Sequence, residues 1–349
     1  MNAIRDKFHQ EINDLDKLIF FYDTETKLLD SFNTTTGTKE EVLVNELSQT
    51  LKSFKISKKQ FNYNSIIISL YGSFERFIEN CIITYVDKIN SLVKAYNNLP
   101  DSITKNHFIL SLTLLNKVEQ PRYNGPLRKE DIIKNLHTCI NTVDEYQLNK
   151  DAFSQHSANF RLQVIDEVFN QIGIKKISSK IIGTDSFSNF IRNYLGLGVN
   201  DQLNESECFQ ILNDLAEYRN YVAHGVTSEI IQNSILKEYL AFFKQYSSSI
   251  IEVLNDNLLY RELEEKGQEL GEITDVFGNG KIICFKTNNI PIQKGDTIIG
   301  KNKNLIVKSL IKNIKLDGTT ITSVDSKNNY EIGIEIDDIM KKTFKLYLL

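Results

Sequence analysis

Residues 204–226, NESECFQILNDLAEYRNYVAHGV, place the strongest constraint on how this chain can fold. Apolar side chains recur there at three- and four-residue spacing, which predicts one amphipathic helix. Asn204 or Ser206 can cap its start, and Gly225 stands where helices commonly stop. The predicted apolar face consists of Cys208, Ile211, Leu212, Leu215, Tyr218 and Val222.

Three polar residues near the end of this helix are unusual for a surface that becomes buried. Arg219 follows Leu215 by four residues and precedes Val222 by three, so it points along the apolar stripe. An arginine on a buried face is costly unless an anion meets it. Asn220 and His224 flank it within about a turn and a half. Together, these three residue types can bind and cleave a phosphodiester.

Helical periodicity continues over most of the chain. Residues 1–267 are predicted to form an all-helical domain, with additional helices at about 100–200. The longest helix, at about 58–95, is apolar on most sides, so we expect it to pass through the centre of a bundle. The chain has 349 residues and is 41% apolar, which allows more than one domain and a sizeable core.

The pattern changes at about residue 268. Residues 270–349 contain short β-branched runs separated by turn sequences such as GNG and KGD, which predict six or seven strands in a small antiparallel β-barrel. Residues 271–349 hold 12 lysines, no arginine and 9 acidic residues, a charge of +3, although the whole chain carries −4. This asymmetry fits a barrel that faces RNA or a ribosome, and equally a lysine-rich edge that discourages aggregation.

Composition argues against several classes of protein. No apolar run approaches the roughly 18 to 20 residues that span a bilayer, and the charged N-terminus has no signal-peptide core. The four cysteines lie far apart, so we expect neither a disulfide framework nor a zinc site. A P-loop sequence is absent, which excludes nucleotide hydrolysis of that kind. We expect a cytoplasmic protein without a metal, a cofactor or membrane contact.

The sequence RNYVAH, residues 219–224, places R-N-x-x-x-H at a helix end and resembles the HEPN superfamily. The likeness is to prokaryotic groups associated with phage defence, including the RiboL-PSP type. These pair such a helix end with an earlier helix of the form SLYGSFERFIE, here residues 69–79. HEPN proteins are helical bundles in which an arginine–histidine motif often forms a metal-independent RNase site. The resemblance implies this fold for residues 1 to about 265.

The resemblance implies a role for each residue of the motif. Arg219 would bind the scissile phosphate and stabilise the charge of the transition state. His224 would take the proton from the ribose 2′-hydroxyl or protonate the leaving 5′-oxygen. Asn220 would orient His224 or the phosphate, and Tyr221 would contact the substrate. The expected products are a 2′,3′-cyclic phosphate and a 5′-hydroxyl.

Other interpretations of these residues remain open. Glu75 is a candidate partner of Arg219 at the substrate site, and equally a member of a structural salt bridge. Arg219 itself could be a core arginine paired with Glu75 or Glu79, and His224 a helix-end residue favoured by the helix dipole. The remaining histidines share no spacing with each other or with acids and are predicted at the surface or the edge of the core: His9, His107, His137 and His156.

The resemblance also implies partners. HEPN nucleases usually bring two motifs together across a two-fold axis, so we expect a homodimer with Arg219 and His224 at or near the interface. The leading function is an endoribonuclease that cuts tRNA or other translation-related RNA in phage defence (abortive infection) or a toxin–antitoxin system, with an antitoxin or activator protein as a further partner. The alternative is a non-catalytic HEPN module that binds a nucleotide or a protein.

The C-terminal segment resembles the second domain of translation elongation factors such as Tu. The resemblance rests on three stretches: KGDTI at 294–298, SL at 309–310 and IGI at 332–334. It implies a barrel that places the helical domain on tRNA or the ribosome, or that docks a sensor. A barrel that only stabilises a dimer or binds an antitoxin is the alternative.

Overall fold

The computed structural model describes most of the chain. The described residues are 1–31, 39–120, 127–141, 145–156, 158–225, 230–303, 305–325 and 329–349. Residue contacts divide the chain into two compact units: a helical unit of Met1–Asp87 with Ala95–Leu254, and a second unit of Lys88–Lys94 with Asn255–Leu349, which holds the strands. The predicted fold class, mainly helical with a C-terminal antiparallel sheet, is confirmed.

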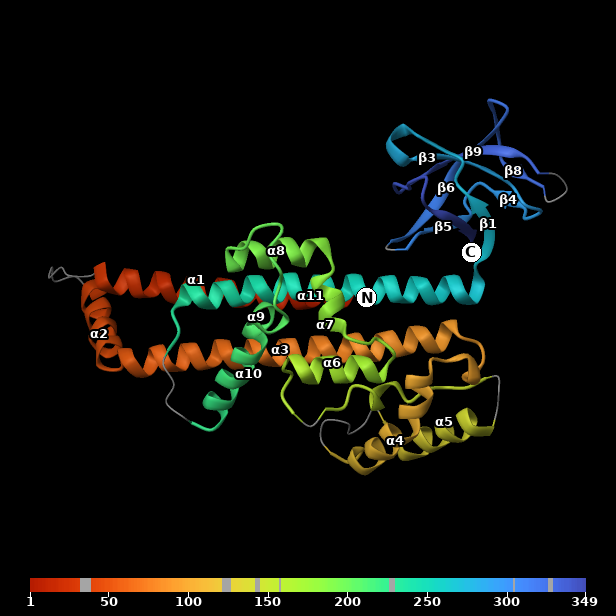
Figure 1. Cartoon of the computed structure of the whole chain (residues 1–349). Helices are drawn as coiled ribbons and strands as arrows, with labels where there is room; N and C mark the ends of the chain where they lie inside the picture. Colours follow the sequence, from red (N-terminus) through yellow and green to blue (C-terminus); the bar gives the residue numbers. More distant parts are fainter. Residues whose placement is uncertain are drawn as a thin grey trace. The chain divides into compact units, whose positions relative to one another are not determined.

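The elements are as follows in chain order (Figure 1). The helices and short 3-10 turns are α1 Asn2–Ser31, α2 Lys39–Ser53, α3 Lys55–Leu92, η1 Tyr96–Asn98, α4 Asp101–Lys117, α5 Lys129–Asn141, η2 Lys150–Ala152, α6 Leu162–Gln171, α7 Ile177–Ile182, α8 Asp185–Leu195, α9 Glu205–Cys208, α10 Gln210–Ala223 and α11 Asn233–Lys266. The strands are β1 Gln268–Glu272, β2 Asp275–Phe277, β3 Ile282–Lys286, β4 Ile292–Gln293, β5 Thr297–Lys301, β6 Ile306–Leu316, β7 Thr319–Ile321, β8 Ser323–Val324, β9 Glu331–Ile336 and β10 Lys345–Leu348, with η3 Gly278–Gly280 after β2.

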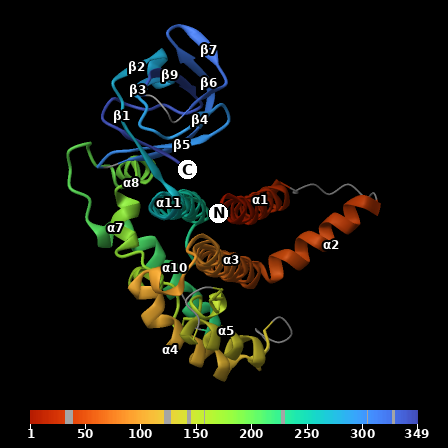
Figure 2. The same cartoon turned by 90° about the vertical axis from the view of Figure 1, so that its right-hand side faces the viewer.

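Three long helices, α1, α3 and α11, lie along one another in the helical unit, and Figure 2 looks down their axes. Phe8 of α1 stacks on Phe77 of α3 with ring centroids 4.8 Å apart. On α3, Phe74 lies 4.8 Å from Phe243 of α11. All four rings are at most 2% exposed, so α3 passes through the centre of the bundle, as its sequence predicts. Among the described residues, no helix is both long and apolar enough to cross a membrane.

The stretch 204–226 is two helices, so the prediction of a single helix is wrong. α9 ends at Cys208, the backbone dihedrals of Phe209 (φ −116°, ψ 16°) are not helical, and α10 begins at Gln210. The interruption lets the Phe209 ring enter the core, where its centroid lies 5.3 Å from Phe187 and 5.6 Å from Tyr246. Tertiary packing outweighs the continuous helical periodicity here.

The predicted ends of this stretch agree better with the structure. The Asn204 side chain accepts a hydrogen bond from the Ser206 backbone N–H (3.0 Å), which caps α9. Gly225 follows α10 with φ of +65°, a conformation that glycine adopts without a steric penalty. Val226, the last residue of the predicted helix, lies outside the described residues.

The second unit contains an eight-stranded antiparallel sheet in the order β1-β10-β5-β6-β9-β3-β2, with β7 paired to β6, and a two-stranded sheet of β4 and β8. Within the described strands no ladder joins β1 to β2, so the sheet is not closed and the predicted barrel is corrected to an open sheet. The sequence predicts six or seven strands, whereas the described residues form ten. Four of the ten have only two or three residues, which is too short to show an alternation of apolar and polar residues.

The two units each have a core, and α11 contributes to both. The sheet curls around buried residues that include Ile283, Phe285 and Ile334, each 0% exposed. A separate small cluster joins the end of α11 to the sheet, where Leu263 packs with Ile299 and Ile306. Residues 255–266 of α11 therefore belong to the second unit.

The Phe209 break predicts a large effect of one substitution. Phe209→Ala should lower the free energy of unfolding by about 3–5 kcal/mol, since it empties a fully buried site beside two aromatic rings, Phe187 and Tyr246. Phe61→Ala is the matched control, because that ring is 70% exposed and its loss should change stability by less than about 0.5 kcal/mol. Urea unfolding followed by circular dichroism measures both, and equal effects would contradict the packing assigned to Phe209.

Candidate functional site

The Arg219 guanidinium is half-buried and lies over the ring of Tyr71 on α3, 5.4 Å from its centroid. Its Nη1 donates a weak hydrogen bond to Asn220 Oδ1 (3.4 Å). No carboxylate among the described residues forms an ion pair with it. Cation–π contact holds the guanidinium by about 0.5–2 kcal/mol while most of its donors stay available. The arrangement is therefore one that can receive an anion.

Asn220 is held from a second side. Its Oδ1 accepts a hydrogen bond of 2.6 Å from Nδ2 of Asn159, in the segment before α6. The same segment is fixed to α3, because the Phe160 backbone N–H donates to the Tyr71 hydroxyl (3.0 Å). Tyr71, Asn159 and Arg219 thus bring three distant parts of the chain to the end of α10.

His156 lies close to these residues, with its ring centroid 4.1 Å from that of Phe160, and sequence spacing did not indicate a role for it. Its Nε2 is 3.0 Å from Glu79 Oε1 and 3.3 Å from Glu75 Oε1, and its Nδ1 is 2.8 Å from the Ala158 carbonyl oxygen. Both ring nitrogens face acceptors, an arrangement that favours a ring with a hydrogen on each nitrogen. Burial lowers the pKa of His156, but the Glu79 hydrogen bond, the Ala158 carbonyl and the two carboxylate charges outweigh it and raise the pKa.

Glu75, Glu79 and His156 form a cluster that could also hold a metal ion. One ligand atom from each lies within 4.8 Å of the others. Two carboxylates and an imidazole are donors that a divalent cation such as Zn²⁺ or Mn²⁺ accepts. A proton shared between His156 and Glu79 satisfies the same atoms, and the geometry above is that of a hydrogen-bonded ion pair.

The structure separates some of the residues that the sequence grouped. Glu75 faces His156, and no described ion pair links Glu75 or Glu79 to Arg219. The Tyr221 hydroxyl donates to Glu217, one turn earlier on α10. His224 is exposed at the C-terminal cap of α10 and, five residues after Arg219, lies about 140° around the helix axis from it.

His107, predicted at the surface or the edge of the core, is fully buried, so that prediction is wrong. Its Nε2 accepts a hydrogen bond from the Asn149 backbone N–H (2.9 Å), and its ring stacks on Phe153. Burial lowers the pKa of His107 to about 4, so the ring is neutral. His107 is therefore a core residue held by one hydrogen bond, and its Nδ1 is buried without a hydrogen-bond partner among the described residues.

A helical bundle with a polar arginine–histidine helix end is the architecture of HEPN domains. The family model described as RiboL-PSP-HEPN matches residues 38–256, and the chain belongs to this family. Membership indicates a nuclease or another RNA-related function. The match includes both α3 and α10, and with them every residue of the site.

Comparison with other proteins adds little. No curated protein matches the chain. Among solved structures, the C-terminal domain of a predicted U32 peptidase from Geobacillus thermoleovorans is similar, with 10% identity and a TM-score of 0.21 over 24% of this chain and 92% of that one. The selenomethionine variant of that domain gives 10% identity and a TM-score of 0.20 over 23% and 96%.

The His156 cluster predicts a pH-dependent contribution to stability. Because folding raises the pKa of His156 above its usual 6.5, the contribution is fully present below that value and is lost as the pH rises through the folded pKa. His156→Gln should therefore lower the free energy of unfolding by about 1.5–3 kcal/mol at acidic pH and by less in alkaline solution.

Urea unfolding of the wild type and the variant between pH 6 and pH 9 tests this expectation. His137→Gln is the control, since that ring is exposed on α5. A His156→Gln effect that stays constant across the range would show that the imidazolium–carboxylate contact does not form.

Proposed function

We propose that this protein is a metal-independent endoribonuclease that leaves a 2′,3′-cyclic phosphate and a 5′-hydroxyl. The observation that carries the proposal is the Arg219 guanidinium, which is half-buried over Tyr71 without a carboxylate partner among the described residues. Arginine binds phosphate through a planar set of donors and remains charged at any working pH. A phosphodiester oxygen would supply the anion that this position lacks.

The chemistry follows from the motif. The ribose 2′-oxygen attacks phosphorus, and its proton passes to His224. The bond from phosphorus to the 5′-oxygen then breaks, and the protonated imidazole of His224 supplies a proton to that oxygen. His156 is not suited to be the base, because both of its ring nitrogens are engaged, one by Glu79 and the other by the Ala158 carbonyl oxygen. His224 is exposed at the end of α10, five residues after Arg219, and is therefore accessible to a bound substrate.

The substrate we propose is tRNA or another RNA of translation, and the setting is phage defence or a toxin–antitoxin system. The prokaryotic HEPN resemblance supports the setting. The likeness of residues 270–349 to the second domain of elongation factor Tu supports the substrate, since a unit of that kind would bring the helical unit to translation RNA. An antitoxin or activator protein would then control the cut.

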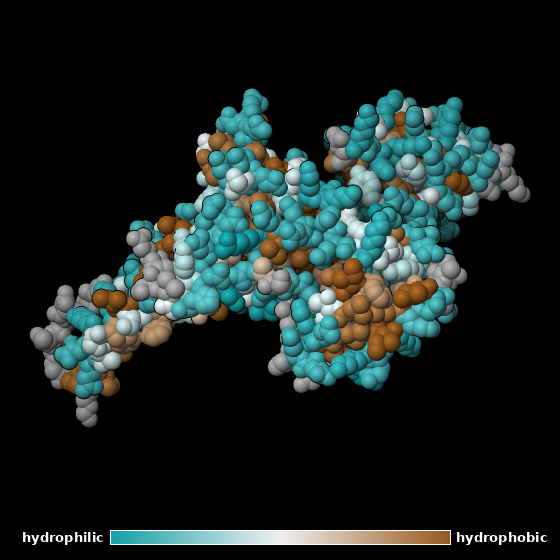
Figure 3. Space-filling model, turned by 60° about the horizontal axis from the view of Figure 1, so that its bottom comes forward, coloured by the Kyte–Doolittle hydropathy of each residue, from teal (hydrophilic) through white to brown (hydrophobic). Residues whose placement is uncertain are grey.

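We further propose a homodimer in which Arg219 of one protomer acts with the partner's His224. Within one chain these two side chains leave α10 about 140° apart, so a single phosphate meets both more easily across a two-fold axis. Exposed apolar side chains also gather over α4 and α5 (Figure 3), namely Phe108, Ile109, Leu112, Ile133 and Ile140. Contiguous apolar surface of this kind favours association with another protein.

Site variants test the reaction. The purified protein should cleave labelled total RNA in the presence of EDTA. Arg219→Ala should reduce the rate of RNA cleavage by about 10²–10³-fold, as loss of a hydrogen-bond donor to the transition state does. His224→Ala should reduce it by about 10²–10⁴. Arg128→Ala, an exposed arginine paired with Asp131, should leave the rate unchanged.

The same assay separates the alternatives. Cleavage that EDTA abolishes and Zn²⁺ or Mn²⁺ restores, with Glu79→Gln also inactive, would favour a metal at the Glu75–Glu79–His156 cluster. RNA that stays intact under every condition, including addition of a lysate from phage-infected cells, would favour the non-catalytic binding module.

The dimer predicts complementation between two inactive variants. Arg219→Ala and His224→Ala chains, each inactive alone, should regain activity after mixing and subunit exchange, because one composite site in the mixed dimer is intact. Light scattering during gel filtration measures the mass in the same samples. A monomeric mass, or a dimer that never complements, would contradict a shared site.

A further inference from the structure

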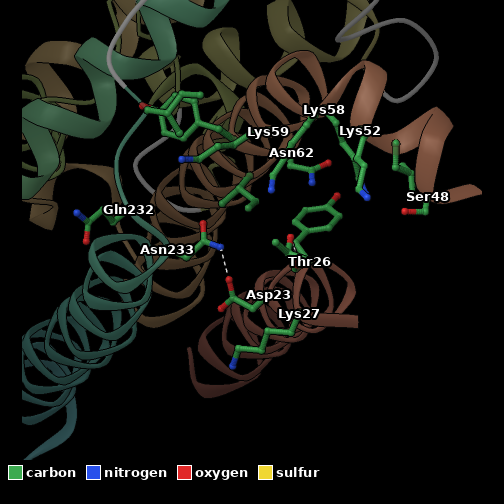
Figure 4. A pocket seen from close by; sticks show the side chains of 16 residues that line it. Asp23, Thr26, Lys27, Ser48, Lys52, Lys58, Lys59, Asn62, Gln232 and Asn233 are labelled. Carbon is green, nitrogen blue, oxygen red and sulfur yellow. Dashed lines mark hydrogen bonds between the residues drawn. The ribbon is translucent and has the colours of Figure 1, made fainter. Parts of the chain in front are cut away.

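A cavity lies in the helical unit, away from Arg219. Its volume is about 470 Å³, and its walls come from α1, α2, α3 and the residues just before and at the start of α11 (Figure 4). None of the residues around Arg219 lines it. A volume of this size is in the range of pockets that take small organic ligands, roughly 300–1,000 Å³.

The cavity is strongly cationic in a chain whose net charge is −4. Three helices contribute its five lysines, of which Figure 4 labels four: Lys27, Lys52, Lys55, Lys58 and Lys59. The one acidic residue among its described lining is Asp23. Cations that converge on a cavity with low-dielectric walls concentrate the field and attract an anion.

The charges of this cavity are only partly compensated. Lys58 forms an ion pair with Glu25. Asp23 accepts a 2.6 Å hydrogen bond from Asn233, which also lines the cavity, and lies 3.8 Å from Lys237. Lys27, Lys52 and Lys59 form no ion pair with any described residue. At least two positive charges thus face the cavity without an opposite charge.

A buried hydroxyl gives independent support for a ligand. Ser48 lines the cavity, is 4% exposed, and its Oγ has no hydrogen-bond partner among the described residues. Buried polar atoms in native proteins almost always have a partner. A ligand oxygen within the cavity would provide one.

The rest of the lining suits a flat heterocycle. Leu51, Ile66 and Ile230 supply apolar surface, and the buried Tyr63 supplies an aromatic ring. Asn62 adds an amide, which offers both a donor and an acceptor. One cavity therefore combines an apolar surface, neutral hydrogen-bonding groups and several lysines.

We propose that this cavity binds a free nucleotide that carries two or more phosphates. The lysines hold the phosphates as point charges, Ser48 donates to an oxygen of the ligand, and the base packs against the apolar wall. A phosphate-bearing RNA strand offers the same chemistry, but the walls of the cavity come from four helices and its volume is in the range of pockets for single small ligands.

Titration calorimetry of the full chain tests the site, with ATP, GTP, ADP, AMP, adenosine and inorganic triphosphate as probes. Binding should tighten from mono- to triphosphate, and adenosine alone should not bind measurably. Lys52→Glu combined with Lys59→Glu should weaken ATP binding at least about tenfold, since it reverses two charges near the phosphates.

The matched control is Lys105→Glu with Lys134→Glu, which reverses the same number of charges on exposed residues of α4 and α5 and should leave binding unchanged. Lys52→Gln with Lys59→Gln is a milder variant with no reversed charge. It should weaken ATP binding while unfolding at the same urea concentration as the wild type.

Three results would overturn the proposal. One is an absence of saturable binding by every nucleotide at millimolar concentration. Another is equal ATP binding by the lysine variants and the control. In the third, the lysine variants bind an uncleavable 2′-O-methyl RNA more weakly than the wild type does, and nucleotides do not displace this RNA from the wild type. The cavity would then be a contact for RNA.

Discussion

The contact between Tyr71 and Arg219 is the interaction on which the candidate site depends. The ring of Tyr71 supports the guanidinium at 5.4 Å, and its hydroxyl accepts the Phe160 N–H at 3.0 Å. Burial and the charges of Glu75 and Glu79 raise the pKa of Tyr71 to about 12, against smaller opposing effects of Phe160 and Arg219. The phenol stays neutral, so one side chain positions both α10 and the segment before α6.

The geometry of α3 explains how a core helix also forms a site. Tyr71, Glu75 and Glu79 are spaced by four residues and therefore share one face. Phe74 and Phe77 point from neighbouring positions into the bundle, where they meet α1 and α11. The polar face thus has rigid support, which favours a fixed arrangement of charges over one that must reorganise around a substrate.

Local features of this structure could be predicted from the sequence, and features that depend on distant contacts could not. The cap at Asn204, the stop at Gly225 and the partial burial of Arg219 follow from residue types and spacing within residues 204–225. The break at Phe209 follows from rings on α8 and α11, so periodicity did not predict it. Four strands of two or three residues are too short to show alternation.

His156 illustrates the same limit at the site. Its partner Glu79 is 77 residues away in the chain, and no spacing pattern links two such positions. The expected pairing of Glu75 with Arg219 was plausible from residue types alone, yet His156 takes that carboxylate. The resemblance to the HEPN superfamily pointed to the motif residues, whereas the surroundings that leave Arg219 without an ion pair among the described residues depend on the fold.

The central claim is that Arg219 binds an RNA phosphate. The most direct test is the salt dependence of binding of an uncleavable 2′-O-methyl RNA, measured by fluorescence anisotropy for the wild type and Arg219→Ala. Losing one phosphate contact should weaken binding and reduce the slope of log affinity against log salt by about 0.7. Identical affinities and identical slopes for the two proteins would contradict the claim.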